Sequence, residues 1–272
     1  MPKLEIGVIV GLAHAEEEIR KVADLGLRSC QVCSWNPAAW TDETGRQLTA
    51  ACKARGVKVS SFWSGYSGPA AWNFTEGPST IGLVPPQYRA QRVAELKAAG
   101  DFAAKFKLPS ITTHLGFLPE DPGDPNYAGA VAAIAEVAGR CAELGIGFHF
   151  ETGQETPVTL LRTIERIGLD NLGINLDTAN VILYGKGNPV DALDVFGRYV
   201  RELHVKDGLF PTDGDHLGRE VPVGEGKVDF PAVIARLKSL GFDGPLTIER
   251  EISGTQQIAD IKKAIAYLER LL

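Results

Sequence analysis

A short signal that ends a helical pattern and leads into an apolar run occurs five times along this chain. It reads DLGLRS, ARGVKV, ELGIGF, RIGLDN and SLGFDG, at intervals of tens of residues. Glycine just past a helix adopts the left-handed backbone conformation at little steric cost, so each signal indicates a helix end followed by a short turn. This recurrence predicts a parallel array in which strands and helices alternate.

Eight short apolar runs, rich in Val, Ile and Leu, are typical of strands buried on both faces. We expect these strands at residues 4–10, 27–33, 57–63, 110–115, 146–151, 172–177, 200–206 and 245–249. Eight strand–helix units in a chain of 272 residues most simply close into an α/β fold of the (β/α)₈ TIM-barrel type, with residues 1–272 as a single domain. The alternative is an open doubly wound sheet, but no GxGxxG motif follows the first run.

The expected loops differ in length between the two ends of the barrel. Long loops follow the third, fourth and seventh strands, at 64–88, 116–126 and 207–229, whereas the loops at the other end are short. Active sites in this architecture lie where the strands end, so we expect the site among the long loops. The first of them mixes aromatic residues with many Gly and Pro, which predicts an aromatic lid over the site.

Composition narrows the function classes. The formal net charge of −6 disfavours a nucleic-acid partner, because phosphate binding needs a basic face. No apolar run reaches the roughly 18 residues of a membrane span, and the stretch 4–12 reads as a buried strand rather than a signal peptide. We therefore expect a cytoplasmic protein with no membrane partner. Cys30 and Cys33 face opposite sides of a predicted strand, so we interpret them as buried thiols.

Metal-binding residue types stand near the ends of four consecutive predicted strands. Glu151 ends GIGFHFE, Asp177 ends LGINLD, His204 lies in YVRELHVKD, and Glu249 ends GPLTIE. Each residue alone has an ordinary explanation, such as a helix cap, a core histidine or a salt bridge. Their recurrence at one end of adjacent strands favours a site for one divalent cation, with Mn²⁺ as first choice and Mg²⁺, Co²⁺ or Zn²⁺ as alternatives.

The motifs around these positions resemble a known family. They are HFETG at 149–153, INLDTAN at 174–180, ELHVKDG at 202–208 and VPVGEGKVDFPAVIARLKSLGFDGPLTIERE at 221–251. Together they are similar to the sugar phosphate isomerase/epimerase group of xylose-isomerase-like TIM barrels, with the best similarity over about 146–251. The resemblance implies that the four strand-end residues are metal ligands and that the substrate is a small sugar.

The same resemblance implies that Glu151 and Glu249 are also the acid/base pair of the ketose 3-epimerases. One glutamate would remove the C3 proton of a ketose, and the other would return a proton to the opposite face, while a metal stabilises the enediolate. Other residues near the strand ends are expected to contact substrate: His114, Asn180, Lys206, Arg219, Trp35, Trp63 and Glu155. The epimerases commonly carry a histidine where this chain has Asn180.

Several other functions use similar residues. An aldose–ketose isomerase would move a proton between C1 and C2 with the same metal, and a lyase acting on 3-keto-glycosides (C- or O-glycoside cleavage) would use the same bases. Some relatives of the lyase type work with a partner subunit, so both such a hetero-partner and homo-oligomerisation stay open. A nuclease like endonuclease IV is disfavoured by the acidic charge and by the presence of only five histidines. A two-carboxylate glycosidase has no use for Asp177 and His204 together, and an inactive sugar-binding barrel would not need the full ligand set.

Overall fold

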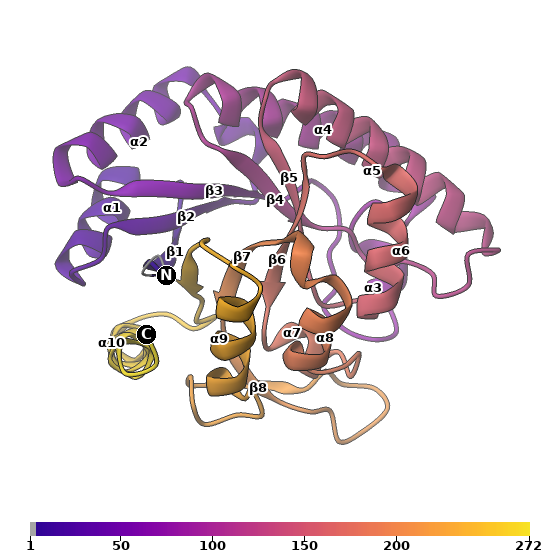
Figure 1. Ribbon diagram of the computed structural model, residues 1–272. Helices are drawn as coiled ribbons and strands as arrows, with labels where there is room; N and C mark the ends of the chain where they lie inside the picture. The colour runs from indigo at the N-terminus through magenta and orange to yellow at the C-terminus, as the bar shows by residue number, and fades with distance from the viewer. Residues whose placement is uncertain (1–3) are drawn as a thin grey trace.

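Eight parallel strands close into a barrel in the computed structural model, which describes residues 4–272 (Figure 1). The barrel strands are β1 (Ile6–Gly11), β2 (Ser29–Ser34), β3 (Lys58–Ser64), β4 (Ser110–His114), β5 (Gly147–Glu151), β6 (Leu172–Asp177), β7 (Val200–Val205) and β10 (Leu246–Ile248). Their order around the barrel is β1-β10-β7-β6-β5-β4-β3-β2. The predicted closed barrel is therefore confirmed, and the open doubly wound sheet is wrong.

Helices alternate with the strands and form an outer layer (Figure 1). They are α1 (Ala15–Asp24), α2 (Asp42–Arg55), α3 (Gly77–Thr80), α4 (Pro86–Lys105), α5 (Pro125–Glu143), α6 (Pro157–Ile167), α7 (Asn180–Leu183), α8 (Pro189–Phe196), α9 (Phe230–Ser239) and α10 (Thr255–Glu269), with 3-10 turns at Pro37–Ala39 and Gly197–Tyr199. The glycines of the five repeated signals all have φ between 63° and 77°, as the sequence predicts: Gly26, Gly56, Gly145, Gly168 and Gly241.

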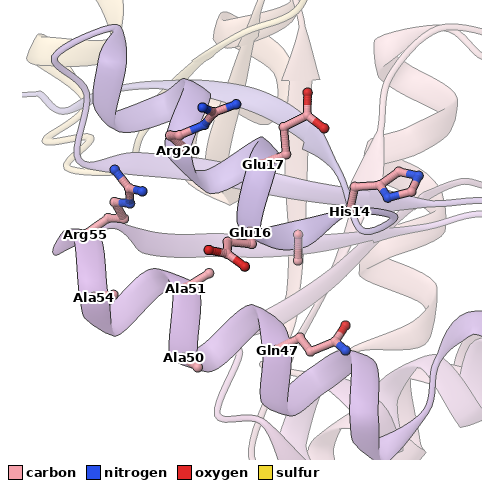
Figure 2. A pocket seen from close by; sticks show the side chains of 10 residues that line it. His14, Glu16, Glu17, Arg20, Gln47, Ala50, Ala51, Ala54 and Arg55 are labelled. Atoms are coloured by element: carbon pink, nitrogen blue, oxygen red, sulfur yellow. The ribbon is translucent and has the colours of Figure 1, made fainter.

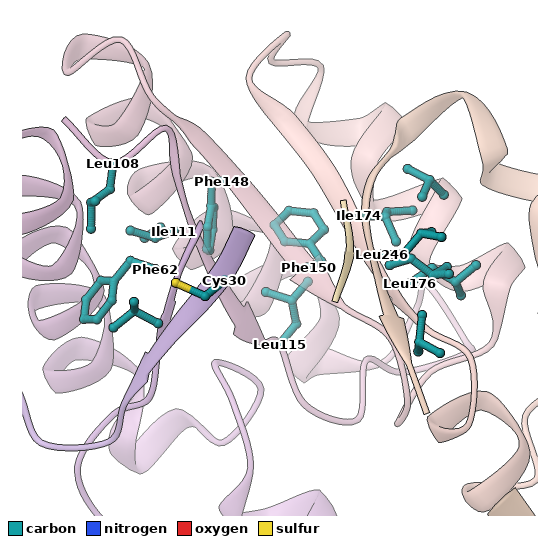
Figure 3. Close-up of a cluster of buried hydrophobic side chains, with 14 of the residues drawn as sticks. Cys30, Phe62, Leu108, Ile111, Leu115, Phe148, Phe150, Ile174, Leu176 and Leu246 are labelled. Carbon is teal, nitrogen blue, oxygen red and sulfur yellow. The ribbon is translucent and has the colours of Figure 1, made fainter. Parts of the chain in front are cut away.

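Apolar side chains from every second strand residue point away from the barrel axis and pack against the helices. Phe148 and Phe150 of β5 show this arrangement, and Leu176 of β6 continues it in the neighbouring strand (Figure 3). All three are fully buried. Burying a side chain of this size stabilises the fold by about 1.5–3 kcal/mol, so this outer shell supplies the main driving force for folding.

The alternate residues, which point into the barrel, are largely polar. The Gln31 amide nitrogen donates to Glu202 Oε2 at 2.7 Å, and His149 Nδ1 lies 2.7 Å from Glu202 Oε1. The hydroxyl oxygens of Ser61 and Thr112 lie 2.8 Å apart. Because these side chains are buried, their hydrogen bonds offset the cost of removing them from water. The barrel interior is thus a hydrogen-bonded network, although the sequence predicts nearly continuous apolar strands.

The loop after β3 is anchored by one arginine. The lid segment, residues 65–85, contains α3 and runs from β3 to α4. The buried guanidinium of Arg92, on α4, donates to the carbonyl oxygens of Ser67, Pro69, Thr80 and Gly82 at 2.7–3.2 Å. A group that makes four such bonds fixes both ends of the segment, so the lid is held in one position over the barrel.

The loop after β7 is organised by Asp207. It contains the antiparallel pair β8 (Asp207–Leu209) and β9 (Arg219–Val221). Asp207 Oδ2 accepts hydrogen bonds from the backbone nitrogens of Gly224 and Gly226, each at 2.9 Å, and Oδ1 accepts from Val228 N at 3.1 Å. One aspartate of the HVKDG motif therefore shapes the distant VPVGEG loop.

Among residues 4–272, no helix has the length and apolar character needed to cross a lipid bilayer.

Gly82→Ala is expected to destabilise the protein far more than Gly26→Ala. Both glycines have positive φ, at 74° and 77°, which costs a residue with a Cβ about 1–2 kcal/mol. At Gly82 the added Cβ would also lie 1.9 Å from the carbonyl oxygen of Leu115, whereas at Gly26 no atom lies within 4 Å. Urea unfolding of both variants measures the difference. Equal losses of stability would show that the lid can move to accommodate the methyl group.

Candidate metal centre and its cavity

The four predicted ligands converge at the C-terminal end of the barrel. Glu151, Asp177 and His204 lie on β5, β6 and β7, and Glu249 is the residue after β10. One ligand atom from each lies within 4.8 Å of the others. The parallel register places Asp177 opposite His204, and the alternation of side chains turns all four residues inward. We call these residues the acidic cluster.

His204 lies at the centre of this cluster. Its Nδ1 is 3.2 Å from Glu151 Oε1, 3.2 Å from Glu249 Oε2 and 3.8 Å from Asp177 Oδ2. Its Nε2 lies 2.6 Å from the amide oxygen of Gln31. Because an amide oxygen only accepts, Nε2 carries the hydrogen of this bond, and Nδ1 is left facing the carboxylates. A metal-binding histidine usually has such a partner on its other nitrogen.

The two oxygens of Asp177 have different environments. Oδ1 accepts hydrogen bonds from the backbone nitrogens of Ala179 and Asn180, each at 2.8 Å, and so forms the start of α7. Oδ2 is buried without a hydrogen-bond partner. Burial raises the pKa of Asp177 to about 7, although Lys206 opposes this shift. Asp177 therefore fulfils its ordinary turn-forming role with one oxygen and presents the other to the cluster.

Lys206 joins the cluster as a buried cation. Its Nζ lies 3.1 Å from Glu249 Oε2, 3.1 Å from Glu251 Oε1 and 3.5 Å from Asp177 Oδ2. Burial alone would lower the pKa of Lys206, but Glu249 and Asp177 outweigh it and hold the pKa well above its ordinary value.

The charges of the cluster fit a divalent cation. Three ionised carboxylates and one lysine leave a net charge of −2 when His204 is neutral. Burial disfavours the charged imidazole, yet Glu151 and Glu249 raise the pKa of His204 well above 6.5, so in the absence of metal a proton is held at Nδ1. The donor set of three carboxylates and one imidazole, with an orphaned Asp177 oxygen, is one that Mn²⁺, Mg²⁺ or Co²⁺ accepts.

A cavity of about 310 Å³ opens directly onto the cluster. Glu151 and Glu249 line it, whereas Asp177 and His204 are fully buried behind them. The two glutamates are thus the cluster members that a bound molecule can reach.

Aromatic rings form one wall of this cavity. Trp35 packs against Trp63 and Trp72, with ring centroids 4.9 and 5.9 Å apart, and the Trp72 ring lies 5.0 Å from that of His114. The indole nitrogen of Trp63 donates to Glu151 Oε2. Burial lowers the pKa of His114, so its ring is neutral at neutral pH. The predicted substrate contacts Trp35, Trp63 and His114 therefore line the cavity.

Of the other four residues predicted to contact substrate, only Asn180 lines the cavity. The Asn180 amide donates to Glu151 Oε1 at 3.3 Å and lines the cavity. Glu155 is buried in the loop after β5, outside the cavity lining, and burial raises its pKa to about 8. Arg219 is exposed on β9 and also lies outside the lining. Lys206 lies behind Glu249. Its ammonium group pairs with Glu249 and Asp177 of the acidic cluster and not with the adjacent residue Asp207.

Three residues near the cluster escape prediction from the sequence. Gln31 and Glu202 lie inside the barrel beneath His204, and Glu251 pairs with Lys206 at the cavity rim. A signal exists for each. Gln31 interrupts the apolar run SCQVC. Glu202 stands two residues before His204 and therefore on the same face of β7, and Glu251 stands two residues after Glu249.

A larger hollow, about 940 Å³, lies elsewhere, between α1 and α2 on the outer layer (Figure 2). It is lined by charged residues such as Glu16, Arg20 and Arg55 and by the alanines of α2. No residue of the acidic cluster lines it. We therefore assign the chemistry to the smaller cavity in the barrel mouth.

The sequence pattern of the family described as "Xylose isomerase-like TIM barrel" matches residues 19–271. A solved structure, the xylose isomerase domain protein of Planctomyces limnophilus, is 37% identical to this chain, with a TM-score of 0.91 and coverage of 99% of this chain and 97% of that one. A xylose isomerase-like TIM barrel protein of Mycobacterium smegmatis, solved in complex with magnesium, has the same fold at 16% identity (TM-score 0.72, coverage 99% and 96%).

Among curated relatives, the L-ribulose 3-epimerase of Methylomonas sp. (strain DH-1) is 30% identical over 156 residues, which cover 54% of this chain and 49% of that protein. The chain spans about half the length of the curated relatives it matches.

Metal affinity is expected to rise as the pH increases from 6 to 8. Metal binding requires Nδ1 of His204 to lose its proton, and the raised pKa of His204 means that this proton is present in the metal-free protein at neutral pH. The Asp177 carboxyl, whose pKa burial raises to about 7, must also be ionised, and it contributes in the same direction. Calorimetric titration with Mn²⁺ in buffers of different ionisation enthalpy would measure both the affinity and the released protons. A metal affinity that is independent of pH would contradict the role of His204 as a ligand.

Gln31→Leu is expected to weaken metal binding by about 10–100-fold, the usual effect of removing the partner of a metal-binding histidine. The substitution leaves Nε2 of His204 without an acceptor and so frees the ring to turn. Gln47→Leu, at an exposed position of α2, is the matched control. An unchanged Mn²⁺ dissociation constant in Gln31→Leu would show that packing alone orients His204.

Proposed function

Because the chain belongs to the xylose isomerase-like TIM barrel family, we propose that it is a divalent-metal-dependent sugar isomerase or epimerase, and specifically that it catalyses 3-epimerisation of a ketose. One observation carries this proposal. Of the four clustered residues, Glu151 and Glu249 line the cavity, while Asp177 and His204 lie behind them. This arrangement supports a division between residues that only hold a metal and residues that also move a proton.

The metal would be held by Glu151, Asp177, His204 and Glu249, with Mn²⁺ as first choice. When bound, it would supply Lewis acidity for the carbonyl of the sugar. The relative from Mycobacterium smegmatis, whose structure contains magnesium, supports a divalent cation in this fold.

The two glutamates are prepared for proton transfer by different partners. Glu151 is held by the Trp63 indole and the Asn180 amide, and His114 Nε2 lies 3.6 Å from its Oε1. Burial would raise the pKa of Glu249, but Lys206 and His204 outweigh it and hold the pKa well below 4.5. Both side chains reach the cavity from separate strands. An ionised glutamate can therefore accept the C3 proton on one face, while the other glutamate, when it carries a proton, returns that proton to the opposite face. General acid–base catalysis of this kind contributes about 10²–10⁴-fold to the rate.

The aromatic wall supports a sugar as the bound molecule. Trp35, Trp63 and Trp72 present ring faces that suit the C–H face of a sugar, and His114 adds a nitrogen that can bond a hydroxyl. Lys206 is paired with three carboxylates, so it is not free to bind a phosphate. An unphosphorylated sugar therefore suits the cavity best.

Hydrogen exchange tests the reaction directly. The metal-loaded enzyme is incubated in D₂O with a panel of ketoses and 3-keto-glycosides, and NMR follows each carbon-bound hydrogen. Exchange at C3 with inversion supports the 3-epimerase. With a ketose, exchange at C1 in place of C3 would make the protein an aldose–ketose isomerase, and release of an aglycone from a 3-keto-glycoside would make it a lyase. The proposal of an isomerase or epimerase fails if no substrate in the panel exchanges any hydrogen.

Asp177→Asn and Glu249→Gln are expected to have different effects. Asp177→Asn removes a ligand charge behind the cavity and should lower metal affinity. Glu249→Gln should retain more of the metal yet lose about 10²–10⁴-fold in turnover, because it removes an acid/base group. Glu251→Gln, also at the cavity but outside the cluster, is the control and should lose much less activity. Metal content and turnover are measured on the same preparations.

The division of roles would be wrong if both variants lost metal equally and both regained activity in excess metal.

A further inference from the structure

A series of hydrogen bonds leads from His204 away from the cavity and into the barrel. His204 Nε2 lies 2.6 Å from Gln31 Oε1, and Gln31 Nε2 donates to Glu202 Oε2 at 2.7 Å. The other oxygen of Glu202 lies 2.7 Å from His149 Nδ1. Gln31 and Glu202 are buried and do not line the cavity. A molecule bound in the cavity therefore does not contact them, and any influence on the site passes through His204.

Glu202 decides which way the amide of Gln31 points. A carboxylate only accepts hydrogen bonds, so the amide nitrogen faces Glu202 and the amide oxygen is left to face His204. In the reversed amide, the oxygen of Gln31 would lie against a carboxylate oxygen at the 2.7 Å that now separates nitrogen from oxygen. Because His204 Nε2 meets an acceptor, it carries a hydrogen, and Nδ1 is the nitrogen available to a metal.

The charge of Glu202 also strengthens the next hydrogen bond. A hydrogen bond to an ionised acceptor is about twice as strong as one between neutral groups. In the barrel interior, hydrogen bonds in series polarise one another, so the bond to Glu202 makes the oxygen of Gln31 a better acceptor. That oxygen in turn draws on the Nε2 hydrogen of His204, which raises the electron density that Nδ1 offers to a metal.

His149 holds Glu202 from the other side, in a slot that two glycines leave open. A Cβ at Gly147 would lie 2.6 Å from His149 Nε2, and one at Gly173 would lie 2.6 Å from its Cδ2. Neither glycine has a positive φ, so their value here is space for the ring and not backbone freedom. Burial raises the pKa of Glu202, but the hydrogen bonds from His149 and Gln31 outweigh it and keep the side chain ionised.

We propose that Glu202 is a positioning residue of the metal centre, which acts through Gln31 to fix the ring of His204 and to strengthen its Nδ1 as a ligand. The inference rests on the metal site of the proposed function, but it does not depend on which sugar reacts.

NMR of the metal-free protein with ¹⁵N-labelled histidine tests the orientation. The Nε2 hydrogen of His204 is identified as the resonance that Gln31→Leu displaces. Glu202→Gln is expected to shift this resonance upfield, because the hydrogen bond to Gln31 becomes weaker. Ser110→Ala is the matched control, since the Ser110 hydroxyl donates at 3.3 Å to the oxygen of Glu202 that does not face Gln31. An unchanged resonance in Glu202→Gln overturns the proposal.

A double-mutant cycle tests whether Glu202 acts through Gln31. Glu202→Gln alone is expected to weaken Mn²⁺ binding by about 10-fold, the lower end of the range for groups that support a metal-binding histidine. Added to Gln31→Leu, it should change the dissociation constant by no more than about twofold, because the connection is already broken. A residue that only stabilised the fold would weaken binding equally in both backgrounds. Losses that multiply would therefore overturn the proposal.

The two measurements separate this inference from the proposed function. If the wild-type protein binds no divalent cation, the metal-dependent reaction fails, whereas the resonance of the metal-free protein still decides the role of Glu202. Glu202→Asp repeats the experiment if Glu202→Gln does not fold, because it keeps the charge but is one methylene too short to reach the Gln31 amide. The same upfield shift is expected, and an unchanged resonance again overturns the proposal.

Discussion

Three carboxylates are buried around one imidazole at the mouth of this barrel, and most of the surrounding structure depends on that concentration of negative charge. Buried carboxylates destabilise a fold unless they are paired or bind a cation. Lys206 supplies one positive charge, Gln31 fixes the ring of His204, and Asp177 uses one oxygen to start α7. These contacts leave a set of oxygen atoms and one nitrogen within 4.8 Å of one another, which a divalent cation would complete.

The inside of the barrel supports this centre from below. Gln31 connects His204 to Glu202, which in turn contacts His149, so hydrogen bonds extend from the cluster into the barrel interior. The lid supports it from above, because Arg92 holds the segment that carries Trp72 against the barrel. A site held from both sides keeps its side chains oriented without relying on the substrate.

The sequence predicts a large part of this arrangement. The five glycine signals locate helix ends, and the strand-end positions of Glu151, Asp177, His204 and Glu249 predict their convergence. The polar interior is harder to predict, because a single polar residue such as Gln31 in an apolar run has many explanations. Its role becomes clear only when β2 and β7, separated by about two thirds of the chain, come together across the barrel. For Arg219 and Glu155 the sequence suggests a substrate contact, but neither residue lies in the cavity lining.

The local sequence pattern alone determines where strands and helices alternate and where each helix ends, because these features depend on backbone geometry. It also determines on which side of a strand a residue lies, because side chains alternate with a period of two residues. The closed barrel decides which of those inward-facing residues meet, since contact across the axis joins residues far apart in sequence. It also decides which members of the acidic cluster line the cavity. Glu151 and Glu249 line the cavity, whereas Asp177 and His204 do not. This difference depends on how deeply each side chain is buried in the folded barrel, which cannot be deduced from the sequence.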